Sequence, residues 1–89
     1  MLTLPAVVTY AQALDTARLL KAKVTSDAAG VVLNASALTQ FDSSALAVLL
    51  TCRRDALAAD KSFAVFGLPA KLGQLAGLYG VAELIPAAA

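Results

Sequence analysis

The clearest helix in this sequence begins within FDSSALAVLL, residues 41–50. Asp42 is a favourable N-cap residue, because its carboxylate can accept hydrogen bonds from the free backbone N–H groups of a first helical turn. Ser43 and Ser44 fill that turn, and apolar residues then recur until residues 60–62 interrupt the pattern. The spacing therefore predicts a helix from Asp42 to about Ala59.

This helix has two apolar bands when its residues are placed at intervals of about 100°. The band best suited to close packing against a sheet comprises Ala45, Val48, Leu49, Cys52, Ala56 and Ala59. A neighbouring band comprises Leu46, Leu50 and Leu57, with Ser43, Ala47 and Arg54 just past it. We expect this second band to remain partly outward, because an apolar patch rimmed by a few polar groups is typical of protein interfaces.

The segments before this helix indicate short strands and another helix. Residues 2–9 favour β structure but contain Pro5, which predicts one or two short edge-strand pieces. Helical spacing then predicts an amphipathic helix from Tyr10 to about Val24 that ends near residues 26–30. Its expected inward residues are Tyr10, Ala13, Leu14, Ala17, Leu20 and Val24. The continuous apolar run at residues 31–33 predicts a strand that is buried on both faces.

The remaining residues continue the alternation of strands and helices. Residues 63–66 predict a buried strand with Phe63 and Phe66 in the core, and a third helix is expected to start near Pro69 and to stop at Gly80. Its expected inward residues are Leu72, Leu75, Ala76 and Tyr79. Residues 81–85 form a short apolar tail. This order predicts an α/β fold, a small mixed or parallel sheet with helices packed on it, in one domain over residues 1–89.

The composition restricts the location of the protein. The chain is 60% hydrophobic and 15% charged, with a mean hydropathy of +0.76, which is more apolar than a typical soluble domain. A membrane span needs about 20 predominantly apolar residues, whereas the longest charge-free runs, residues 1–14 and 28–41, have 14 residues. We expect no membrane span, no signal peptide and a cytoplasmic protein whose single cysteine, Cys52, is a packed side chain.

The residue types disfavour catalysis, metal binding and nucleic-acid binding. The sequence has no histidine, which removes the common nucleophilic triads and the commonest zinc ligand. The six carboxylates follow no metal-loop spacing, and no glycine-rich phosphate motif is present. The net charge is +1 with scattered Lys and Arg, so no nucleic-acid surface is indicated. We expect no enzyme activity, no cofactor, no metal and no nucleic acid.

Residues 41–50 resemble the Asp-Ser-Ser/Thr-Gly-Leu signature of STAS domains, a family of anti-sigma-factor antagonists and transporter-associated regulatory modules. The segment VVLNAS, residues 31–36, is similar to the strand that precedes the signature, with Asn34 where the family has Asp. The family's last strand and helix resemble residues 63–68 followed by Leu75, Leu78, Val81, Leu84 and Ile85. The resemblance covers nearly the whole chain, apart from a pared-down first strand, and implies a STAS-like fold.

The resemblance also implies a role for Ser43. In phosphorylatable antagonists of the family, the residue directly after the signature Asp is the switch, and Ser43 holds that place. The free N–H groups and the dipole at a helix N-terminus would favour a phosphate there, which would add about −1.5 to −2 charges to an interface. The family glycine is replaced by Ala45. The alternative, that Ser43 and Ser44 only satisfy first-turn N–H groups, stays open.

Among STAS domains, the chain looks most like the small MlaB-type subunit of the Mla phospholipid-transport ABC system. This resemblance implies a non-enzymatic module that docks on the ATP-binding subunit at the inner face of the inner membrane. The implied interface comprises Ser43, Ala47, Leu50 and Arg54, with Ala45 and Leu46 beside them. One alternative is an anti-sigma-factor antagonist whose Ser43 is phosphorylated by a kinase-type anti-sigma factor. Another is a small-molecule-binding or enzymatic domain that uses Asp42 with the two serines, and a homodimer through the exposed leucines also stays open.

Overall fold

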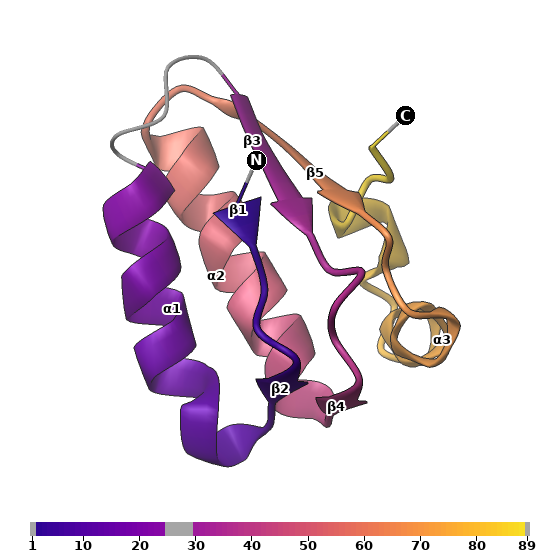
Figure 1. Cartoon of the computed structure of the whole chain (residues 1–89). Coiled ribbons are helices and arrows are strands. Elements are labelled where there is room, and N and C mark those ends of the chain that lie inside the picture. The colour runs from indigo at the N-terminus through magenta and orange to yellow at the C-terminus, as the bar shows by residue number, and fades with distance from the viewer. Residues whose placement is uncertain (1, 25–29, 89) are drawn as a thin grey trace.

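The computed structural model describes residues 2–24 and 30–88 and shows the predicted α/β architecture (Figure 1). Its strands are β1 (Leu2–Thr3), β2 (Val7–Val8), β3 (Gly30–Asn34), β4 (Gln40–Phe41) and β5 (Ser62–Phe66). Its helices are α1 (Tyr10–Val24), α2 (Ser43–Ala58), α3 (Ala70–Leu78) and the 3-10 turn η1 (Ala82–Leu84). No helix among the described residues is long and apolar enough to cross a membrane.

The strands form two small sheets in which every pairing is parallel. β3 lies at the centre of a three-stranded sheet in the order β1-β3-β5, and its register pairs Leu33 with both Leu2 and Val65. The second sheet consists of the ladder between β2 and β4, with Val8 opposite Phe41. The sequence analysis did not predict β4. Because Val8 and Phe41 precede the starts of α1 and α2, this short ladder brings the N-termini of the two helices together.

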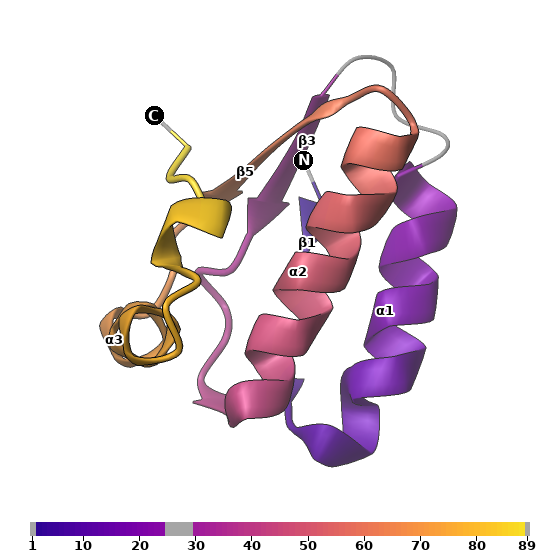
Figure 2. The ribbon, with the colours of Figure 1, turned by 180° about the vertical axis from the view of Figure 1, so that it is seen from behind.

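The helices α1 and α2 run parallel to each other along one face of the three-stranded sheet (Figures 1 and 2). The strand residues facing these helices are buried: Leu2, Val31, Leu33, Phe63 and Val65. In contrast, Val32 and Ala64 are only half-buried, so the expectation that the strand at residues 31–33 is buried on both faces is wrong. Phe66 is 44% exposed, because its separation of three residues from Phe63 places the two rings on opposite faces of the sheet.

The inward side of α1 also differs from the prediction. Its buried residues are Thr16, Leu20 and Val24, whereas Tyr10 and Leu14 are 84% and 63% exposed. Tyr10 and Leu14 remain exposed because they line a surface hollow between α1 and α2 that neither the sheet nor α2 covers. The predicted end of this helix near residues 26–30 falls mostly outside the described residues.

Two further residues expected inside lie at helix ends and are exposed. Tyr79 is the C-cap residue of α3 and is 59% exposed, and Ala59 is the C-cap residue of α2. After Tyr79 the chain turns at Gly80, whose positive φ of 73° favours glycine, as predicted for this helix stop. Both residues lie where a helix ends, so helical spacing no longer determines which side chains are covered there.

Candidate interaction site

Asp42 holds the beginnings of two helices. Its Oδ1 accepts a hydrogen bond of 2.8 Å from the backbone N–H of Ser44, and its Oδ2 accepts one of 3.1 Å from the backbone N–H of Tyr10. The predicted N-cap of α2 is therefore confirmed, and the same carboxylate also binds the first residue of α1. The bond from Ser44, with a smaller contribution from Tyr10, lowers the pKa of the Asp42 carboxyl, because both N–H groups favour the ionised form.

The start of α1 is fixed by a second set of hydrogen bonds. The Gln12 Oε1 atom accepts from both the backbone N–H and the hydroxyl of Thr9, at 3.0 and 2.5 Å. The backbone N–H of Gln12 in turn donates to the Thr9 carbonyl at 3.0 Å. A side chain that reaches back from the first turn in this way is a capping-box arrangement. Both helices therefore begin at defined positions, side by side.

The outward face of α2 carries four of the predicted interface residues. Ser43, Ala47 and Arg54 are exposed and Leu50 is half-buried. Their helical spacing places them within about 60° of one another around the axis. Leu57, 49% exposed, extends the same face toward the end of the helix. We call Ser43, Ala47, Leu50 and Arg54 the outward stripe of α2.

The other two predicted interface residues lie in the core. Leu46 is only 4% exposed, so the expectation that it lies in the outward band is wrong. Ala45 is 1% exposed, as its place in the sheet-facing band predicted, and is therefore not part of an accessible interface. Ala45 lies on the side of α2 that faces the sheet. Helical spacing places Leu46 on the flank opposite Val48, and α3 packs against α2 from that side (Figure 2).

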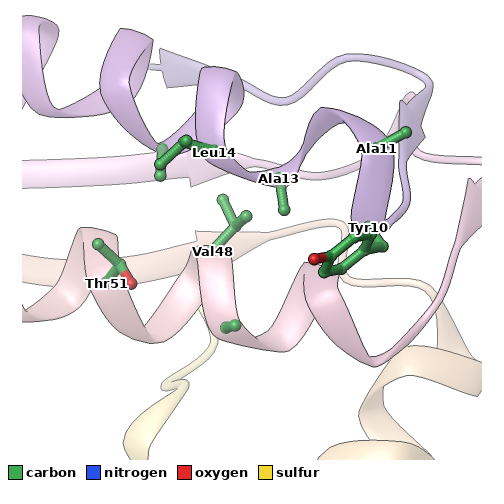
Figure 3. A pocket seen from close by; sticks show the side chains of 8 residues that line it. Tyr10, Ala11, Ala13, Leu14, Val48 and Thr51 are labelled. Carbon is green, nitrogen blue, oxygen red and sulfur yellow. The ribbon is translucent and has the colours of Figure 1, made fainter.

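An apolar groove between α1 and α2 lies beside the outward stripe (Figure 3). Its volume is about 480 Å³, and it is lined by Tyr10, Ala11, Ala13, Leu14, Ala17, Ala47, Val48 and Thr51. Tyr10 lies at one end of the groove, while Leu14 and Thr51 lie toward the other. This groove was not predicted from the sequence, because the helical spacing of Tyr10 and Leu14 indicated core positions. The spacing of four residues between Tyr10 and Leu14 could have indicated the groove, because the same spacing describes an apolar stripe on an uncovered side of a helix.

Residues 3–86 match the family model described as "Mlab, STAS domain". The chain belongs to the STAS domain family. The match supports the MlaB type within this family, and STAS domains are in general non-enzymatic modules. No curated protein matches the sequence.

In this STAS domain the departure from the family signature at Ala45 is internal. Ala45, which replaces the family glycine, is buried, so its methyl group leaves the outward stripe unchanged. Ser43, in the place of the family's switch residue, is exposed in the first turn of α2.

The Cys52 thiol is packed in the core, and the Asp42 carboxylate caps α2. Burial, and secondarily the charge of Asp55, raises the pKa of the Cys52 thiol to about 11, so the thiolate that would react is scarce at neutral pH. Both carboxylate oxygens of Asp42 accept backbone hydrogen bonds. Within residues 2–24 and 30–88, His, Cys, Asp and Glu side chains form no group of three that could hold a metal ion.

Proposed function

We propose that this STAS domain docks on the ATP-binding subunit of a phospholipid-transporting ABC complex and supports the assembly or activity of that complex. The domain would then act at the inner face of the inner membrane through its partner. The observation that carries the proposal is the outward stripe of α2, which stands uncovered in a chain of the MlaB type.

The chemistry of the stripe suits a protein partner. Ser43 and Ala47 are small, so a partner's backbone or side chains can approach the helix closely at its N-terminal half. Leu50 supplies apolar area at the centre, and Arg54 supplies a charge at the far end. A small apolar centre with polar ends corresponds to the usual core and rim of an interface.

The experiment is a binding measurement between the full chain and the transporter's ATP-binding subunit. We expect Leu50→Asp and Ser43→Asp to weaken binding strongly, because each places a carboxylate on the contacting face. Leu78→Asp is the matched control, since Leu78 is 81% exposed on α3 and does not belong to the outward stripe of α2. Equal recovery of the ATP-binding subunit by wild type and Leu50→Asp would refute the assigned face.

A second candidate is a phosphorylation switch at Ser43, favoured by the exposure of this residue in the first turn of α2. The partner would then be a kinase-type anti-sigma factor. Mass spectrometry after incubation with ATP and that kinase separates the two candidates. A phosphate on Ser43 supports the switch, and an unmodified peptide supports the transporter.

A further inference from the structure

The groove between α1 and α2 continues into a second hollow along the same two helices. This hollow has a volume of about 160 Å³ and shares Leu14, Ala17 and Thr51 with the groove. Its remaining lining residues are Arg18, Lys21, Arg54 and Asp55. Because α1 and α2 run parallel, the groove is apolar along their N-terminal halves and cationic toward their C-terminal halves.

The cationic end has an excess of positive charge. Arg18, Lys21 and Arg54 are exposed, and none of them pairs with a carboxylate in residues 2–24 or 30–88. Asp55 is the single acidic residue that lines the hollow. Its Oδ2 atom is buried and accepts no hydrogen bond from the described residues. Three cationic side chains against one carboxylate leave an excess of positive charge in the lining.

We propose that the groove receives an amphipathic acidic segment of the ATP-binding subunit, with apolar side chains between Leu14 and Ala47 and carboxylates at Arg18, Lys21 and Arg54. This inference rests on the proposed function and names the part of the partner that is bound. Ala47 and Arg54 belong both to the groove walls and to the outward stripe of α2, so the groove is continuous with the proposed interface.

Charge and shape favour a peptide segment in this groove. Four alanines line it, Ala11, Ala13, Ala17 and Ala47, and such small side chains let the backbone of a bound helix or strand approach closely. Opposite charges at one end would fix the direction in which the segment lies and speed its association. An acyl chain in an open groove would keep much of its surface in water, which reduces the gain from burying it.

The test uses variants on α1 only, because α1 contains no residue of the outward stripe. Leu14→Ser removes apolar area from the groove, and Arg18→Glu with Lys21→Glu reverses charge at its cationic end. The matched controls are Leu19→Ser, since Leu19 is 66% exposed and does not line this groove, and Lys71→Glu on α3. Binding of the full chain to the ATP-binding subunit is measured between about 50 and 500 mM salt, a range over which screening strengthens.

We expect Leu14→Ser to weaken binding about tenfold at all salt concentrations, as loss of an apolar anchor does. The double charge reversal should weaken it about tenfold at low salt and progressively less at high salt. The controls should bind as wild type does. If Leu50→Asp abolishes binding while both α1 variants bind normally, the groove inference is wrong and the proposed function stands. If wild type does not bind the ATP-binding subunit, the proposed function itself fails.

A lipid outcome is measured separately with vesicles that contain anionic phospholipid. The groove would be assigned to lipid if three results were found together. The wild-type chain floats with these vesicles, Leu14→Ser and the double charge reversal do not, and both variants still bind the ATP-binding subunit. That combination would overturn the inference. Absence of flotation together with weakened binding to the ATP-binding subunit is the expected result.

Discussion

Truncation of Leu46 to alanine tests which flank of α2 belongs to the core. Leu46 is 4% exposed, so the change removes three carbon atoms from a covered position. At about 0.8 kcal/mol per buried CH₂ group, the lost transfer free energy is about 2.4 kcal/mol. The cavity that remains raises the expected destabilisation to about 3–4 kcal/mol. Leu50→Ala should cost about 1 kcal/mol, because Leu50 is only half-buried.

These losses are large for a domain of this size. At about 0.05–0.15 kcal/mol per residue, the 89 residues give a free energy of unfolding of about 4–13 kcal/mol. A loss of 1 kcal/mol lowers the Tm of such a domain by about 4–8 °C. Leu46→Ala should therefore lower the Tm by about 12–30 °C, and Leu50→Ala by about 4–8 °C.

The assay is urea denaturation of the isolated chain followed by circular dichroism. Leu57→Ala is the matched control, because Leu57 is 49% exposed on the same helix. A smaller loss of unfolding free energy in Leu46→Ala than in Leu50→Ala would contradict the burial of Leu46. The helix α2 would then be rotated about its axis relative to the structure. Binding to the ATP-binding subunit gives a second check. The folded fraction of Leu46→Ala should bind with wild-type affinity, whereas folded Leu50→Asp should not.

Four further predictions concern Asp42, Cys52, Gly67 and Gly77. Because the pKa of the Asp42 carboxyl is lowered in the folded protein, its stabilising contribution is present above the ordinary pKa of 3.8 and is lost as the pH falls through the folded-state pKa. Asp42→Ala should therefore lower the urea midpoint more at pH 6 than at pH 3. Cys52 should resist iodoacetamide at pH 8 in the folded protein and react after denaturation, because burial raises its pKa to about 11; rapid labelling of the native chain would contradict this. Gly67→Ala should cost about 1 kcal/mol or more in urea denaturation, because φ is +70° and the new Cβ would lie 2.9 Å from the Ser36 Cβ. Gly77→Ala, which meets nothing within 4 Å, should instead stabilise α3 by up to about 1 kcal/mol.

Local chemistry explains what the sequence predicted correctly. The start of α2 follows from Asp42 alone, because an N-cap acts on N–H groups two or three residues away. The outward stripe follows from the fixed rotation of about 100° per residue, which places Ser43, Ala47, Leu50 and Arg54 together whatever the helix packs against. These features do not depend on where distant parts of the chain lie.

The errors concern which neighbour covers each flank of a helix. Periodicity places Leu46 between the sheet-facing and the outward sides of α2 but does not reveal that α3 packs there. In α1 the error is the opposite one: Tyr10 and Leu14 fit an apolar stripe and were expected in the core, yet they are exposed. Phe66 was misplaced for a simpler reason: a separation of three residues in a strand changes the face.

The groove has its origin in an element that is too short to recognise in a sequence. β2 and β4 have two residues each, and their pairing brings Asp42 within reach of the backbone N–H of Tyr10. The two helices are tied at their N-termini and run parallel, and small alanine side chains of both helices line the boundary between them. The exposed Tyr10 and Leu14 therefore line a surface hollow and are not core residues. Part of the high apolar content of the chain is thus explained by a surface that is suited to a partner.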